Sequence, residues 1–106
     1  MEKEVEIGLK YDAGKPLLAD MLQDFKGPLE QVSRVWEFGK NKYGFRNWRH
    51  VEDAEHRYTN ALVRHLCAED DKDTDDDSNL LHAAHVAWNA LARLHFILES
   101  RKNSPQ

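Results

Sequence analysis

The chain has 106 residues, of which 32% are charged and 41% are hydrophobic, and its formal net charge is −4. This size predicts a single domain (1–106), and the acidic balance excludes a general electrostatic attraction to nucleic acid. No apolar run approaches the ~20 residues that a membrane-spanning helix requires, so we expect no membrane partner. The single cysteine, Cys67, excludes an internal disulfide and favours a cytoplasmic location.

The first half of the chain predicts a short helix followed by a long one. Residues 1–16 look irregular, because Asp, Gly and Pro punctuate their second half. Residues 17–25 predict a short helix with an apolar stripe. A second helix is expected from Pro28 to Tyr43, since Pro suits a first helical turn and Gly44 follows. Its apolar positions have helical spacing: Leu29, Val32, Trp36, Gly39 and Tyr43.

The second half predicts two more long helices, separated by an acidic loop. Residues 45–51 form an aromatic and basic connection, and a helix follows over about 52–69. Residues 69–79 are rich in aspartate, and the last helix spans about 80–101, with 102–106 expected to fray. Its apolar face consists of Leu80, Ala84, Ala87, Trp88, Leu91, Leu94 and Leu98. The fold class is therefore all-α: a small helical bundle of three long helices plus a short N-terminal helix.

A polar line runs along the start of the last helix. His82, His85 and Asn89 stand at i, i+3 and i+7, which places them on one side of the helix, at the edge of its apolar face. With carboxylates just before them, and with His65 on the inner side of another helix, they suit a divalent metal. The same line is also consistent with a purely structural role, in which its side chains form hydrogen bonds between helices. In that interpretation Asp77 or Ser78 is the N-cap of the last helix.

Several blocks of the chain, in order, resemble one known family. They are Lys10-Tyr11-Asp12-Ala13-Gly14-Lys15-Pro16; Phe38 to Gly44 with Asn47-Trp48-Arg49; Arg64-His65-Leu66; and Asp75 to Asn89, including Ser78. This series is similar to that of phage-associated dATP/dGTP diphosphohydrolases, which resemble MazG-type all-α nucleotide pyrophosphohydrolases. Asp77 stands where that pattern has Glu, and Asn79 stands where it has Gly. Asn tolerates a left-handed backbone, so we expect the turn to survive.

The resemblance implies a metal-dependent hydrolase that converts purine deoxynucleoside triphosphates to monophosphate and pyrophosphate, with Mg²⁺ or Mn²⁺ as cofactor. Asp77, His82 and His85 are then the catalytic candidates. The metal candidates are His65, Asp75, Asp77, His82 and His85. The substrate-binding candidates are Lys15, Lys42, Arg57 and Arg64 for phosphate, Asn47 and Trp48 for the base, and Asn89. Trp48 equally suits a purely structural role, as an aromatic plug at the end of the bundle.

Two other classes of function remain open, and so does the assembly. The same pocket suits a phage protein that sequesters a nucleotide or a nucleotide messenger without turnover, and the acidic surface suits a protein-binding inhibitor of a host defence system. For a phage protein, the expected location is the cytoplasm of the host cell. A bundle this short leaves apolar surface uncovered, so we expect a homo-oligomer, either a dimer or a tetramer.

Overall fold

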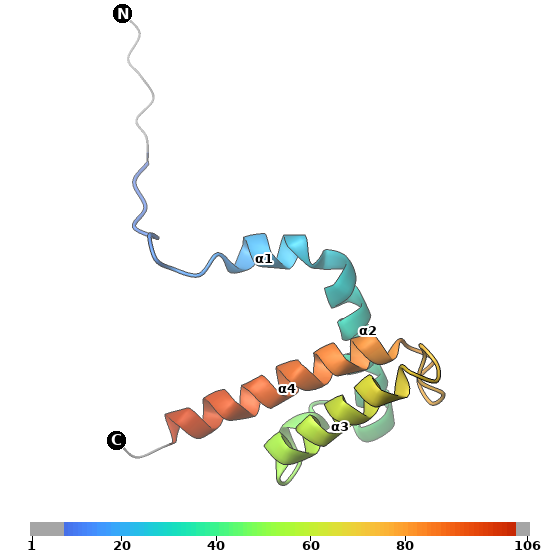
Figure 1. Ribbon diagram of the computed structural model, residues 1–106. Coiled ribbons are helices and arrows are strands. Elements are labelled where there is room, and N and C mark those ends of the chain that lie inside the picture. Colours follow the sequence, from blue (N-terminus) through green and yellow to red (C-terminus); the bar gives the residue numbers. More distant parts are fainter. Residues whose placement is uncertain (1–7, 104–106) are drawn as a thin grey trace, which may run out of the picture.

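The computed structural model describes residues 8–103, and all regular structure within that range is helical (Figure 1). The elements are α1 (Leu18–Asp24), α2 (Lys26–Tyr43), a 3₁₀ helix η1 (Asn47–His50), α3 (Ala54–Ala68) and α4 (His82–Lys102). An isolated β-bridge joins Thr74 to Leu81 in the loop before α4. The all-α prediction is confirmed, while the expectations for residues 1–7 and 104–106 lie outside the described residues.

Helices α3 and α4 form an antiparallel pair, and the second half of α2 crosses this pair at the end where the 69–81 loop joins it (Figure 1). The loop is held by backbone hydrogen bonds: the amide of Asp75 donates to the carbonyl of Leu80, and the amide of His82 donates to the carbonyl of Asp73, both at 2.8 Å. This arrangement brings the acidic loop, the start of α4 and the end of α2 to one place.

The core is small and largely aromatic. Ala54, Tyr58 and Ala92 are buried at its centre, and four partly buried side chains pack around them: Trp48, Val51, Trp88 and Phe96. The rings meet mostly edge to face, the orientation that aromatic pairs favour. The Tyr58 hydroxyl donates a 2.9 Å hydrogen bond to the carbonyl of Trp48, which ties η1 to α3.

The start and the buried side of α4 differ from the sequence-based expectation. The helix begins at His82 rather than Leu80, and neither Asp77 nor Ser78 caps it, because its N-cap position is Leu81. The buried positions of α4 are His82, Ala84, His85, Asn89 and Ala92, so the polar line lies at the centre of the buried side and not at its edge. Helix α4 has apolar side chains over a wide part of its circumference, but α2 and α3 cover only one side of it.

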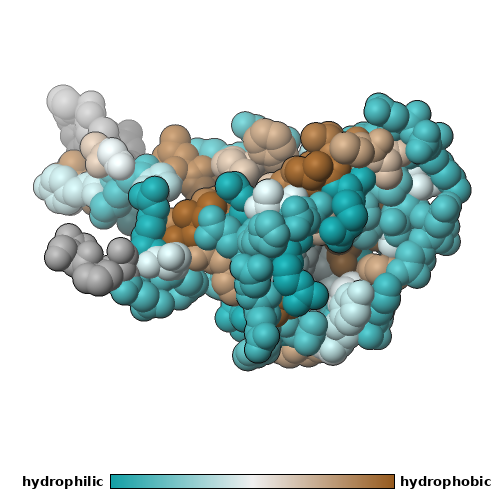
Figure 2. All heavy atoms as spheres, turned by 60° about the horizontal axis from the view of Figure 1, so that its bottom comes forward, coloured by the Kyte–Doolittle hydropathy of each residue, from teal (hydrophilic) through white to brown (hydrophobic). Residues whose placement is uncertain are grey.

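Two apolar helix faces are uncovered. Helix α1 has no buried residue, and its contacts are mainly with the start of α2, so that it projects from the helix pair (Figure 1). Its stripe of Leu18, Met21, Leu22 and Phe25 is 45–62% exposed. On α4, Leu91, Leu94 and Leu98 are each about half exposed. Apolar surface accordingly emerges between hydrophilic regions in the space-filling view (Figure 2).

Candidate functional site

A cavity of about 420 Å³ lies where α2, η1, α3 and the start of α4 converge. This volume falls in the range of small-molecule sites. Its lining divides into a cationic part, an aromatic part and a part with histidine and aspartate. The cationic side chains are Lys40, Lys42, Arg46, Arg57 and Arg64. A cavity with that many cations suits an anionic ligand with several charges.

The cations come from three separate segments. Arg57 and Arg64 are seven residues apart on α3 and therefore share one side of the helix. Lys42, near the end of α2, forms an ion pair and hydrogen bond with Asp77 of the acidic loop. Its ammonium also lies 5.6 Å from the centre of the Phe38 ring and 5.3 Å from that of Tyr43. The hydrogen bond with Asp77 is the main reason why the pKa of Lys42 is raised.

The aromatic part is continuous with the protein core. Trp36, Trp48, Tyr58 and Trp88 all line the cavity. Trp48 is held by edge-to-face contacts with Trp88 at 5.9 Å and with His95 at 4.9 Å between ring centres. Trp48 therefore has a structural role, and together with Trp36, Tyr58 and Trp88 it offers an apolar wall on which a nucleobase could stack.

Three histidines gather at the cavity: His65 and His85 line it, and His82 contacts His65 from behind. The Nδ1 atoms of His65 and His82 are 2.8 Å apart and share a hydrogen bond. The rings of His65 and His85 stack, with centres 4.3 Å apart and planes 8° from parallel. His82 and His85 are buried, and His65 is partly buried. The turn spacing of α4 thus presents two imidazoles to the one that α3 supplies.

Asp75 completes this cluster from the acidic loop. Its Oδ2 accepts hydrogen bonds from the backbone amides of Asp77 at 3.1 Å and Ser78 at 2.8 Å. Its Oδ1 lies 4.0 Å from Nδ1 of His65. One ligand-type atom each from His65, Asp75 and His82 lies within 4.8 Å of the others. Partial burial raises the pKa of Asp75, but the hydrogen bonds from Ser78 and the nearby His85 and His65 together lower it by more, so the carboxylate is favoured.

The environment keeps two of the histidines neutral. Burial is the main cause that lowers the pKa of both His65 and His85, and the mutual repulsion of their charged forms lowers it further for His85. Both pKa values therefore lie below the ordinary histidine value of about 6.5. Neutral imidazoles have a free nitrogen lone pair, so near pH 7 they are able to accept a proton or bind a metal.

Ser78 has a role at the site that the sequence analysis did not assign. Its hydroxyl lies 2.7 Å from Nε2 of His85 and also accepts a hydrogen bond from the amide of Leu80. The hydroxyl orients the imidazole instead of capping α4. Its position in the sequence, between Asp77 and the His82/His85 pair, indicates a residue of the site. The same position is equally typical of a serine that caps a helix.

Most of the predicted site residues meet at the cavity. The lining includes ten of them: Lys42, Asn47, Trp48, Arg57, Arg64, His65, Asp75, Asp77, His85 and Asn89. His82 lies directly behind, bonded to His65. Asp77 lines the cavity, but its carboxylate is paired with Lys42 and is not a member of the His65–Asp75–His82 group. Asn89 is buried and donates to the carbonyl of His85.

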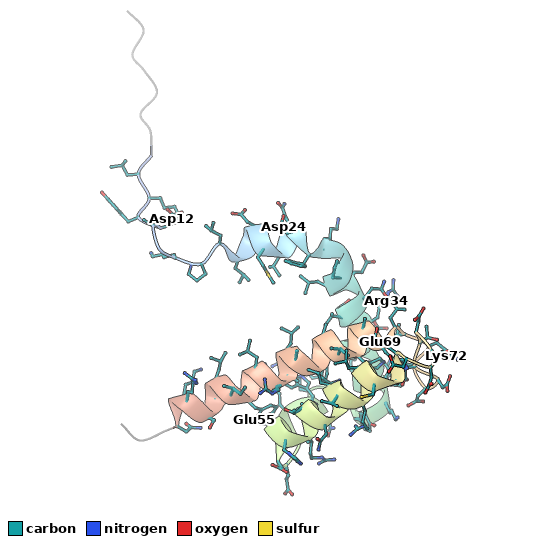
Figure 3. All side chains as sticks on the ribbon, in the orientation of Figure 1. Asp12, Asp24, Arg34, Glu55, Glu69 and Lys72 are labelled. Carbon is teal, nitrogen blue, oxygen red and sulfur yellow. The ribbon has the colours of Figure 1, made fainter. Side chains whose placement is uncertain are left out.

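Lys15 is the exception among the predicted residues. It belongs to the exposed segment before α1 and does not line the cavity. Its amide donates to the carbonyl of Asp12 at 3.0 Å, in a turn that Gly14 completes with φ of +79°. Figure 3 shows Asp12 far from the loop end of the helix pair, where Glu69 and Lys72 lie. The structure therefore places the ammonium of Lys15 away from the other phosphate-binding candidates of its own chain.

Comparison with known proteins identifies the family. The family described as dATP/dGTP diphosphohydrolase, N-terminal, matches residues 5–105. The chain belongs to this dATP/dGTP diphosphohydrolase N-terminal family. A similar protein is the dATP/dGTP diphosphohydrolase of Salmonella phage PMBT28, which is 36% identical over 98 residues, 92% of this chain and 32% of that protein. The chain thus spans about a third of the length of this relative.

The match to the dATP/dGTP diphosphohydrolase N-terminal family confirms the resemblance and covers every residue of the cavity. Asn79, which replaces the glycine of the family pattern, has φ of +62°, so the turn does survive in this member. No solved structure matches the chain significantly. The likeness of its fold to MazG-type proteins therefore stays a prediction. Among the described residues, no helix is long and apolar enough to cross a membrane.

Proposed function

We propose that this chain hydrolyses purine deoxynucleoside triphosphates to the monophosphate and pyrophosphate in the 420 Å³ cavity. The observation that carries the proposal is the composition of this one cavity. Five cationic side chains, an aromatic wall and a partly buried His–Asp cluster line it, in a chain of the dATP/dGTP diphosphohydrolase N-terminal family. The printed name of the phage relative supports the purine deoxynucleotide as substrate.

The three parts of the lining correspond to the three parts of such a substrate. Lys42, Arg57 and Arg64 are assigned to the phosphate oxygens, because guanidinium and ammonium groups pair with phosphate through charge-assisted hydrogen bonds. The base is assigned to the aromatic wall, with Trp48 held in place by its neighbours. Asn47 and Asn89 offer amide groups in the same cavity.

The predicted metal fits the residues that are present. His65, Asp75 and His82 supply two imidazole nitrogens and one carboxylate oxygen, and these atoms together suit a divalent cation. When bound, such a cation neutralises phosphate charge and lowers the pKa of water. We assign the divalent cofactor to these three residues; of the two predicted ions, Mg²⁺ and Mn²⁺, their two imidazoles favour Mn²⁺.

In the proposed reaction a water oxygen attacks the α-phosphorus, and the bond from this phosphorus to the bridging oxygen breaks. Pyrophosphate leaves with the bonding electron pair. The proton of the attacking water passes to His85, which lines the cavity and is neutral near pH 7 because burial lowers its pKa. Arg57 and Arg64 stabilise the negative charge that develops on the leaving group.

A second candidate function is nucleotide binding without turnover. The observation that favours it is the state of the two carboxylates in the lining, Asp75 and Asp77. Asp77 is paired with Lys42, and one oxygen of Asp75 is committed to backbone amides. Such a cavity holds a nucleotide well, but it leaves few acidic groups free for chemistry.

We further propose that the chain forms a homo-oligomer. The supporting observation is the pair of uncovered apolar stripes, one on α1 and one on α4, because exposed apolar helix faces gain free energy when a second copy covers them. A dimer in which the projecting α1 of each copy lies against α4 of the other buries both stripes at once. A reciprocal arrangement of this kind forms a closed dimer.

Product analysis by ion-exchange chromatography tests the activity. Purified chain is incubated with dATP, dGTP, dCTP or dTTP and with Mg²⁺ or Mn²⁺, and binding is measured in parallel by calorimetry. We expect deoxynucleoside monophosphate and pyrophosphate from the purine substrates. Arg64→Ala should weaken binding by roughly ten- to a hundredfold, as the loss of a charge-assisted hydrogen bond predicts.

The matched control is Arg34→Ala. Arg34 is an exposed arginine of α2 that pairs with Glu30 and does not line the cavity (Figure 3). Binding should be unchanged in this variant. Binding without product under every metal condition would replace the hydrolase by the sequestering function, and no binding of any nucleotide would reject both.

A further inference from the structure

The donor atoms in the His65–Asp75–His82 group are unusual for a magnesium site. Two of the three are imidazole nitrogens, whereas Mg²⁺ prefers oxygen ligands in nearly ideal octahedral geometry and is reluctant to lose its waters. Imidazole suits zinc, nickel, copper and iron, and the affinity of a nitrogen site for first-row dications rises from Mn²⁺ through Co²⁺ to Cu²⁺. The ligand atoms of this group therefore favour a transition-metal ion over Mg²⁺.

Each of the three side chains is fixed by a different element. His65 extends from α3 and stacks on His85. His82 is the first residue of α4, and its own backbone amide is bound to the carbonyl of Asp73. Asp75 has one oxygen bound by two loop amides, which leaves its Oδ1 on the side of His65, at 4.0 Å. The three ligand atoms are thus held together before any cation binds, which lowers the entropic cost of binding one.

The two imidazoles face each other through the same type of atom. Without a cation, a hydrogen bond between the two Nδ1 atoms at 2.8 Å requires that one of them carries a proton and the other accepts it. A cation held by both rings would need both lone pairs, so its binding would release this proton and move the two Nδ1 atoms slightly apart.

We propose that His65, Asp75 and His82 form a three-ligand site that binds a transition-metal dication such as Mn²⁺, Co²⁺ or Zn²⁺ and discriminates against Mg²⁺. Only the role of the bound ion in hydrolysis rests on the proposed function; the binding itself does not. Three protein ligands leave further coordination positions for water or a phosphate oxygen, as in catalytic rather than structural metal sites.

The remaining two candidates from the sequence analysis are assigned outside this ligand set. Nε2 of His85 is engaged by the hydroxyl of Ser78 at 2.7 Å. The Asp77 carboxylate is engaged by the ammonium of Lys42. We therefore assign His85 to accept the proton of the attacking water, and Asp77 to position Lys42. Both residues lie next to the metal site and are not ligands.

The test uses the tag-free chain, the metal chloride alone as probe and no nucleotide. Co²⁺ binding is followed by its visible absorption bands, and thermal unfolding is recorded with Mn²⁺, Co²⁺, Zn²⁺ or Mg²⁺ at equal concentrations. A cation that binds only the native state raises the Tm, on the order of 10 °C at a hundredfold excess over Kd. We expect this rise with the transition metals and no rise with Mg²⁺.

The variants separate ligands from bystanders. His65→Ala, His82→Ala and Asp75→Asn should each weaken Co²⁺ binding at least tenfold. Asp75→Asn keeps the size of the side chain and an oxygen for the loop amides, so it serves where an alanine variant fails to fold. The control is His56→Ala, because His56 is an exposed histidine of α3 whose side chain contacts only Asn60 in the described hydrogen bonds.

Two results would overturn the inference: a Mg²⁺ shift equal to that of Mn²⁺, or Co²⁺ binding that Asp75→Asn and the histidine variants leave unchanged. Turnover of a purine deoxynucleotide with Mg²⁺ but without Co²⁺ binding would reject this site and leave the hydrolase proposal standing. Co²⁺ binding without turnover of any nucleotide would support the site and reject the hydrolase.

Discussion

The imidazoles of His65 and His82 face each other through their Nδ1 atoms at 2.8 Å, and this contact joins α3 to the first residue of α4. Both groups are removed from bulk water to a large degree, and His82 as a whole residue is 7% exposed. Each therefore depends on the other for a hydrogen bond. The same pair gives α3 and α4 their register at the loop end and supplies two of the proposed metal ligands.

His82→Ala should lower the free energy of unfolding of the metal-free protein by about 1–3 kcal/mol, because it leaves a partly buried nitrogen of His65 without its partner. Urea denaturation in the presence of EDTA measures this loss. His56→Ala, on the exposed side of α3, should change the same free energy by less than about 0.5 kcal/mol. Equal losses in the two variants would mean that the His65–His82 contact contributes nothing to the fold.

Asp77→Ala should lower turnover without affecting folding. Asp77 and Lys42 are both substantially exposed, so their ion pair contributes little to stability, and helical circular dichroism should be unchanged. Lys42 nevertheless loses the group that holds it at the cavity. The control is Asp76→Ala, since Asp76 forms a comparable but more exposed pair with Lys72 and does not line the cavity. Wild-type turnover in both variants would remove Asp77 from the mechanism.

Tyr58 should give the protein a stability that depends on pH in the alkaline range. Burial raises the pKa of its phenol to about 12 in the folded protein, compared with about 10 in the unfolded chain. The neutral form is favoured by folding, so this contribution is complete below pH 10 and is lost as the pH rises from 10 to 12. Absorbance at 295 nm should show a tyrosine that ionises near pH 12 and is missing in Tyr58→Phe.

The uncovered stripe on α4 predicts the state of assembly. Light scattering after gel filtration should give the mass of a dimer or a tetramer. Leu94→Glu with Leu98→Glu should shift the protein toward the monomer, because both leucines are about half exposed and charges there oppose burial. Ser100→Glu, at an exposed position of the same helix, is the control. A monomeric wild-type chain at high concentration would contradict the proposal.

The order and type of the helices followed from the sequence because apolar spacing and local breakers decide them. Gly44 ends α2 as predicted, and the Asp-rich run after α3 forms a loop. Ten of the predicted site residues also meet at the cavity, and the family blocks mark all of these except Arg57. Helical spacing and helix breakers are local features of the sequence. The family blocks, in contrast, come from matching this chain to related sequences residue by residue.

The errors arise where tertiary contacts decide the outcome. The start of α4 was placed at Leu80, but the Thr74–Leu81 bridge and the hydrogen bond from His82 to Asp73 hold the loop until residue 81. The polar line was placed at the edge of the buried face, because leucines elsewhere on α4 are more hydrophobic. In the fold, those leucines face outward and the histidines face α3, a choice that depends on the partner helix.

The central claim, that the chain directs water to the α-phosphorus of a purine deoxynucleoside triphosphate, is tested most directly by hydrolysis in ¹⁸O-labelled water. Mass spectrometry of both products locates the oxygen that came from the solvent. The proposed reaction predicts one ¹⁸O atom in the deoxynucleoside monophosphate and none in the pyrophosphate. Label in the pyrophosphate, release of single phosphate, or the absence of any product with every metal tried would contradict it.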